Sequence, residues 1–328
     1  MPRTAQWIAL SLGLATAALA AGCATNPSRT DEFRRAVPRT ESLVMHMPGD
    51  GAGSEAGGAR AALIGETATF YGYTRQWIDG VNGYVFALRG VLDAVLDTDP
   101  VWRSDDTAVF GPFGGGLEPA RYLVIVHART ATEFDLAILA KPRAASDDAY
   151  RAVLGGTSEL ITEDLSRGAI AIDGAVLHEL DPIGHPDQVN VWIEYDEGTR
   201  QLHVAMLDGA PSPAGIDAQA VDYRYGSGID GAGGVIVVAH GGVDAAGAAN
   251  PDFFMGSQWT AAGAGRSDFA ERGGALGADV VVGGLECWDD GFGRSFFADT
   301  LGDTEGDAAS CAFSSSIFDA MGAAGGST

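Results

Sequence analysis

Histidines and carboxylates gather in one short stretch of the chain, and these side chains commonly bind divalent metal ions. The stretch contains His178, Glu179, Asp181, His185 and Asp187. A metal held by His178 and His185 would make the chain a metal-assisted hydrolase. The same residues also fit a polar loop around Pro182 and Pro186, because His178 and Asp181 would face opposite sides of a continuing strand. We favour the loop.

A second acidic group lies near the C-terminus. It consists of Asp299, Asp303, Glu305 and Asp307. Oxygen-rich loops of this kind can bind calcium. The spacing does not match a known calcium-binding loop, so we expect a solvated acidic turn.

The sequence motifs of the common enzyme classes are missing. The chain has no Gly-x-Ser-x-Gly turn, no phosphate-binding loop ending in Gly-Lys-Ser/Thr, no His-Glu-x-x-His helix and no Cys-x-x-Cys pair. We therefore expect no catalytic residues, no cofactor and no enzyme activity.

The N-terminus has the composition of a secretory signal. Arg3 supplies a positive charge, an uncharged apolar run follows to Leu19, and Leu19-Ala20-Ala21-Gly22-Cys23 comes next. This run is similar to the lipobox of bacterial lipoproteins. The resemblance implies that residues 1–22 are removed and that Cys23 is lipidated. Because Ala24 follows Cys23, it also implies an outer-membrane lipoprotein on the periplasmic face or the cell surface. An uncleaved membrane helix and a plain secretory signal are the alternatives.

Two further cysteines, Cys287 and Cys311, remain in a chain that the signal would send to an oxidising compartment. An even number of cysteines there favours a disulfide. A metal or redox pair is the alternative, but such a pair needs closer spacing or nearby histidines.

The chain is strongly acidic. It carries 44 acidic and 20 basic side chains, a formal net charge of −24, and Lys141 is its one lysine. Nucleic-acid binding depends on lysine and arginine contacts to phosphate, so a nucleic-acid partner is excluded. The expected partners are a membrane, contacted through lipidated Cys23, and an apolar small molecule or another envelope protein.

Residues 23–65 are expected to be a tether. They are polar up to Thr40, and residues 49–60 are rich in Gly, Ala and Ser, as flexible loops are. Between these stretches apolar residues alternate over residues 43–47, which predicts one short strand.

An apolar stripe predicts one long helix over residues 66–96. The residues that recur at steps of three, four and seven are Phe70, Trp77, Val81, Tyr84, Val85, Leu88, Val91, Leu92 and Val95. Gly80, Gly83 and Gly90 each weaken an isolated helix by about 1 kcal/mol relative to Ala. We therefore expect the helix to be held by packing against or inside a sheet. A helix on a lipid surface is the alternative, although its polar face has little positive charge.

After Pro100 the apolar pattern changes to period two. Strands are expected at 107–111, 121–129, 134–140, 150–157, 168–173, 189–195, 202–207, 220–225, 234–240, 253–260, 266–272 and 277–285. About a dozen short strands at close spacing predict a mainly β fold, an antiparallel curved sheet or incomplete barrel with one long packed helix. Residues 66–328 would form one domain.

A long helix on a curved antiparallel sheet resembles, in architecture, the periplasmic lipoprotein carriers, in which acyl chains bind beneath the helix. The resemblance implies a non-enzymatic protein with an apolar ligand between helix and sheet. Trp77, Val81, Tyr84 and Leu88 are the candidate cavity residues. A structural or adhesion-type envelope protein with a solid core is the alternative.

Overall fold

The computed structural model describes residues 27–49, 63–115, 118–183, 188–207, 218–228, 231–241, 249–277 and 280–318. Cys23, His185 and the Gly-rich residues 50–60 lie outside this part of the chain. So do the side chains of Tyr84 and Leu88.

The described residues are mainly strand. The helices are α2 (Pro27–Ala36), α3 (Thr40–Leu43), α4 (Thr69–Asp97) and α5 (Gly174–Leu180), with short 3-10 turns η1 (Asp147–Ala149), η2 (Gly274–Leu276) and η3 (Ala308–Ser310). The first seven strands are β1 (Trp102–Arg103), β2 (Thr107–Phe113), β3 (Ala120–Ala128), β4 (Glu133–Pro142), β5 (Arg151–Leu160), β6 (Ser166–Ile172) and β7 (Asn190–Asp196). The remaining strands are β8 (Gln201–Leu207), β9 (Ala218–Ser227), β10 (Gly233–Gly241), β11 (Asp252–Trp259), β12 (Gly265–Arg272), β13 (Val281–Trp288), β14 (Arg294–Asp299) and β15 (Thr304–Gly306).

Residue contacts divide the chain into two compact units. Unit 1 comprises Met1–Val44 and Gly83–Arg200, and unit 2 comprises Met45–Asn82 and Gln201–Thr328. The single domain expected over residues 66–328 stays a prediction.

Within each unit the strands form an antiparallel meander. Strands β1 to β7 of unit 1 pair in chain order, and so do β8 to β15 of unit 2. Among the described strands, neither order closes on itself. The predicted mainly β fold with one long helix is confirmed, and α4 differs from the predicted helix by only a few residues at its ends.

The sheet of unit 1 is covered by short helices. Phe33 of α2 meets Phe134 of β4 edge to face, with ring centroids 6.3 Å apart, and both side chains are fully buried. Helix α5 contacts β4, β5 and β7 and buries Leu177 and Leu180. These apolar contacts hold the short helices in place.

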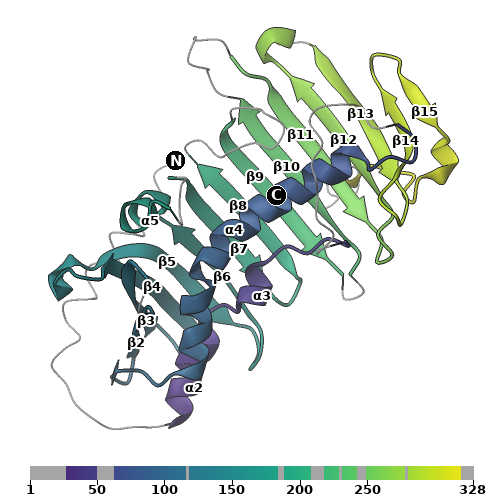
Figure 1. Ribbon diagram of the computed structural model, residues 1–328. Helices are drawn as coiled ribbons and strands as arrows, with labels where there is room; N and C mark the ends of the chain where they lie inside the picture. Colours follow the sequence, from purple (N-terminus) through teal and green to yellow (C-terminus); the bar gives the residue numbers. More distant parts are fainter. Residues whose placement is uncertain are drawn as a thin grey trace. The chain divides into compact units, whose positions relative to one another are not determined.

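In unit 2 the first half of α4 crosses the strands (Figure 1). Phe70 stacks on Phe269 of β12 at 3.9 Å, the Thr74 and Ser257 hydroxyls lie 2.6 Å apart, and Trp77 meets Tyr223 of β9 at 5.4 Å. One helical turn rises 5.4 Å, close to the spacing of about 4.8 Å between strands. Successive turns of the helix can therefore contact successive strands.

The expected tether is wrong over residues 27–36, where the chain forms helix α2. Pro27 suits a first helical turn because its missing N–H would have no helical partner there. Phe33 and Ala36 are fully buried. Two buried apolar residues in an otherwise polar segment are enough to dock this helix, but they are too few to reveal it by periodicity.

The strand expected at residues 43–47 is also wrong, since α3 ends at Leu43 and the described residues after it form no strand. Side chains take the place of a partner strand. The Asn82 amide accepts the N–H of Met45 (2.9 Å) and donates to its carbonyl (2.8 Å). The Tyr225 hydroxyl contacts the backbone N–H and carbonyl of His46, each at 3.0 Å.

Candidate binding surface on the back of unit 2

The sheet of unit 2 has a second face, opposite α4. Ser257 points toward Thr74 of α4. Successive side chains of a strand alternate between faces, so Gly256 and Gln258 point away from the helix. We call this side the back face of unit 2.

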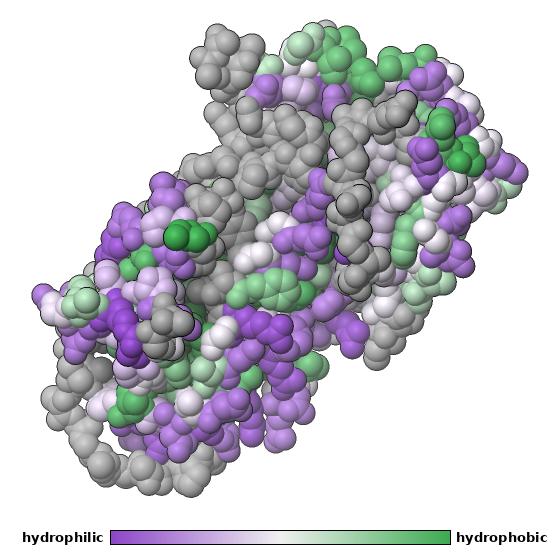
Figure 2. All heavy atoms as spheres, in the orientation of Figure 1, coloured by the Kyte–Doolittle hydropathy of each residue, from purple (hydrophilic) through white to green (hydrophobic). Residues whose placement is uncertain are grey.

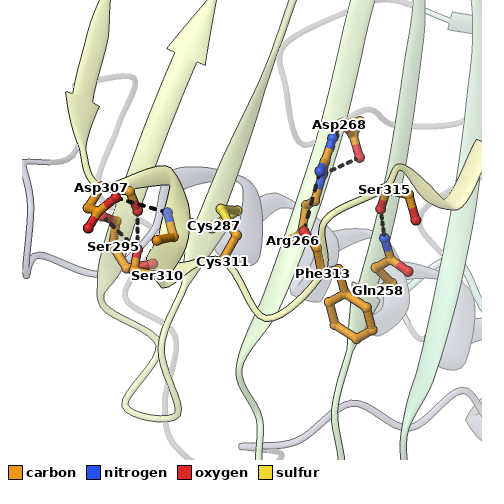
Figure 3. Close-up of a disulfide and its surroundings, with 11 residues drawn as sticks. Gln258, Arg266, Asp268, Cys287, Ser295, Asp307, Ser310, Cys311, Phe313 and Ser315 are labelled. Atoms are coloured by element: carbon orange, nitrogen blue, oxygen red, sulfur yellow. Dashed lines mark hydrogen bonds and ion pairs between the residues drawn. A yellow bond between two sulfur atoms is a disulfide. The ribbon is translucent and has the colours of Figure 1, made fainter.

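A C-terminal segment starts on the back face at a disulfide. The sulfur atoms of Cys287 and Cys311 lie 2.12 Å apart and their Cα atoms 5.3 Å apart (Figure 3). Cys287 points to the back face because its neighbour Glu286 contacts α4. The pairing expected from the cysteine count is confirmed. We call residues 311–318 the strap.

Two side chains of the sheet bind the backbone of the strap. Arg266 Nη1 of β12 donates to the carbonyl of Phe313 at 3.3 Å, and Gln258 Nε2 of β11 donates to the carbonyl of Ser315 at 2.7 Å (Figure 3). The guanidinium of Arg266 is also held by Asp268, with Nη2 2.6 Å and Nε 3.0 Å from its carboxylate oxygens. This charged pair fixes the direction of the Arg266 donor.

The end of the strap rests on glycines. A Cβ atom built at Gly256 would lie 2.5 Å from Cγ2 of Ile317 and 3.0 Å from the ring of Phe318, and one at Gly234 would also collide with Ile317. The two glycines therefore leave the space that the Ile317 side chain occupies.

A shallow hollow of about 670 Å³ adjoins the strap. Its lining residues are Gly228, Ala232, Gly233, Gly234, Gln258, Trp259, Thr260, Ala261, Ala262, Phe313 and Ile317. Small and apolar residues prevail, so the hollow suits an apolar side chain better than a charged one.

An ion pair lies elsewhere on the back face. His203 Nε2 is 2.7 Å from the carboxylate of Asp222, and Arg224 is 3.6 Å away. Burial alone would raise the pKa of Asp222, but the hydrogen bond and charge of His203, with the help of Arg224, hold that pKa below its usual range. These contacts hold the three side chains in place on the back face.

The predicted cavity residues that the structure describes are in the core. Trp77 is 2% exposed and Val81 is 1% exposed, and neither lines the hollow. The indole N–H of Trp77 has no hydrogen-bond partner among the described residues.

The described members of the predicted metal cluster lie on and beside α5. His178 is part of the helix, and Glu179 pairs with Arg151 at 2.6 Å. No three histidine, cysteine, aspartate or glutamate side chains in the described ranges lie close enough together to hold a metal ion. In the second acidic group, one carboxylate oxygen of Asp299 accepts the N–H groups of Leu301, Gly302 and Asp303, so this carboxylate stabilises a turn.

The sequence did not predict the residues that contact the strap. Their one local signal was Arg266 and Asp268 at positions i and i+2 of a strand, which places both on one face. The partners Gly234, Gln258 and Ile317 come from distant segments, and a single sequence does not indicate which of these segments meet.

No family model, curated protein or solved structure matches this chain. Within the described residues, no helix combines the length and apolar composition needed to cross a bilayer.

Proposed function

We propose that this chain is a non-enzymatic outer-membrane lipoprotein with a solid core, a structural or adhesion-type envelope protein that acts through its surfaces. The packing of α4 on the sheet of unit 2 carries the proposal. Thr74, Ser257 and Ser267 are fully buried and joined by hydroxyl contacts of 2.6 Å. This polar chain occupies the layer where a carrier would keep an apolar ligand.

The surface also supports the proposal. On the face drawn in Figure 2, hydrophobic residues form separate groups among hydrophilic ones. Large apolar side chains that are more than half exposed include Leu63, Val101, Ile183 and Leu301, which come from different parts of the sequence. Scattered exposed apolar residues are normal for a protein surface in water.

One observation favours an apolar-ligand carrier as the second candidate function. The buried N–H of Trp77, without a partner among the described residues, could donate to the head group of a bound fatty acid. A buried donor without a partner costs about 1–3 kcal/mol, and a ligand that accepts this hydrogen bond would recover part of that cost.

Thermal melting with a fatty acid separates the two functions. The wild-type protein is melted with increasing palmitate, and with butyrate as a control for carboxylate effects. A solid core predicts no palmitate-specific rise in Tm. A rise that grows with palmitate concentration, as mass action requires of a ligand that binds the folded state, would favour the carrier.

The anchor is tested by metabolic labelling with a radioactive fatty acid. Cys23→Ala should abolish the label and release the protein from the membrane fraction, because no thiol remains at the lipobox. The Cys287→Ser/Cys311→Ser variant is the control and should keep the label. Label retained on Cys23→Ala would refute the lipoprotein assignment.

A further inference from the structure

We propose that the Cys287–Cys311 disulfide is a redox-operated latch, which a dithiol reductant opens to free the strap while the sheet of unit 2 stays folded. The proposal goes beyond the proposed function and does not depend on the anchor at Cys23. It rests on where unit 2 buries its residues, on how the strap is held, and on which cysteine of the pair a reductant can reach.

The C-terminal stretch that carries the strap contributes no buried residue to unit 2. From Thr300 to Phe318 every residue is exposed or half-buried. Buried residues of the unit, such as Trp77, Tyr223 and Ser257, lie instead between α4 and the sheet. Hydrophobic stabilisation is proportional to the apolar area that is buried. We therefore expect the sheet to stay folded when the strap is free.

Few noncovalent contacts hold the strap in the described part of the chain. Arg266 and Gln258 each donate one hydrogen bond to its backbone, and the side chains of Ile317 and Phe318 lie over glycines of the sheet. Hydrogen bonds add little net stability where water can replace either partner. The strap therefore depends on the disulfide to stay in place.

The strap lies at the end of a loop that the disulfide closes. The two cysteines are 24 positions apart, and the chain between them runs through β14, the exposed three-residue strand β15 and η3. Closing such a loop raises the effective concentration of a segment at its contact site. Opening the disulfide should therefore shift the strap from bound to free, because its few noncovalent contacts then act alone.

The two cysteines differ in exposure. Cys287 is fully buried, whereas Cys311 is half-buried and lies between the exposed residues Ser310 and Ala312. Thiol–disulfide exchange requires a thiolate to reach one of the two sulfur atoms. A reductant can therefore approach the pair from the side of Cys311.

Thiol–disulfide exchange opens the latch in two steps. A thiolate of the dithiol attacks the Cys311 sulfur, the bond to Cys287 breaks, and Cys287 leaves as a thiolate that takes up a proton. The second thiol of the reductant then attacks the reductant sulfur bound to Cys311, which closes the reductant into a disulfide and releases Cys311 as a thiol. Two electrons and two protons pass from the dithiol to the two cysteines, and a small disulfide reverses both steps.

Opening the latch uncovers apolar surface on the back face. Ile317 leaves the space above Gly234 and Gly256. Ile236, directly opposite Gly256 on β10, lies on the same face. The adjoining hollow loses the wall that Phe313 and Ile317 form. The oxidised protein therefore covers a surface that the reduced protein exposes.

Limited proteolysis of the full-length chain with chymotrypsin, which cuts after aromatic residues, tests the latch. The bond after Phe313 reports on the strap, and the bonds after the buried residues Phe253 and Tyr223 report on the sheet. The protein is digested with and without the dithiol dithiothreitol. Fragments are identified by mass, and free thiols are counted after alkylation. The Cys287→Ser/Cys311→Ser variant is the matched control.

Reduction should speed cleavage after Phe313 by about tenfold or more and leave the bonds after Phe253 and Tyr223 uncut. The control variant should be cut at the fast rate whether or not dithiothreitol is present. Equal rates of cleavage after Phe313 in the oxidised and reduced chains would overturn the proposal. So would a disulfide that dithiothreitol fails to reduce in the folded protein. Cleavage after Phe253 on reduction would overturn it too, since the disulfide would then hold the sheet itself.

Discussion

A single carboxylate fastens the N-terminus of α4 to the sheet. Glu286 is fully buried, and its oxygens accept the N–H groups of Thr69 (3.1 Å) and Phe70 (2.5 Å). Arg294, 3% exposed, donates to the same carboxylate at 2.6 Å. Burial raises the pKa of Glu286, although these hydrogen bonds and the charge of Arg294 act in the opposite direction. The N–H groups at the start of the helix and the buried cation both favour a negative charge at this position.

Glu286→Gln should lower the free energy of unfolding by about 3–5 kcal/mol, because it leaves Arg294 buried without its counter-charge. Chemical denaturation of the wild type and the variant measures the difference. A free energy of unfolding for Glu286→Gln equal to that of the wild type would show that Arg294 does not depend on this carboxylate.

Residue types alone predicted the disulfide, because two leftover cysteines in an oxidising compartment have few other roles. They did not predict the Glu286–Arg294 pair. Neither residue has a distinctive neighbour in the sequence, and their meeting depends on the register of β13 and β14.

At the scale of elements, the sequence was most informative where one periodicity lasted for many residues. The stripe on α4 and the apolar patterns on β2 to β12 predicted these elements because each pattern extends over most of its element. The segment Val44–Met47 misled because its alternation is real but its backbone is bound by Asn82 and Tyr225. Such side-chain partners have no periodic signal.

Asn82→Ala should cost about 2 kcal/mol of stability, since it leaves the N–H and carbonyl of Met45 without their partners in a buried site. Asp79→Ala, at an exposed position of the same helix, is the control and should change stability by less than about 0.5 kcal/mol. Equal effects of the two substitutions, measured by urea denaturation, would show that Asn82 does not hold this segment.

At the scale of the whole molecule, composition and pattern predicted the mainly β class, while the candidate site depended on long-range contacts. The strap lies on glycines from β10 and β11, and glycine carries no apolar pattern to read. The proposed function depends on whether side chains fill the interior between α4 and the sheet of unit 2.

The free energy of unfolding of Trp77→Ala tests that claim most directly. Trp77 is 2% exposed and packs on Tyr223, so a solid core predicts a loss of about 3–5 kcal/mol, as for other large truncations in close-packed interiors. Phe86→Ala on the same helix is the control. Phe86 is 49% exposed, so this substitution should lower the free energy of unfolding far less. If Trp77→Ala lowered the free energy of unfolding no more than Phe86→Ala, the result would contradict the account, because side chains would then not fill the space between α4 and the sheet of unit 2.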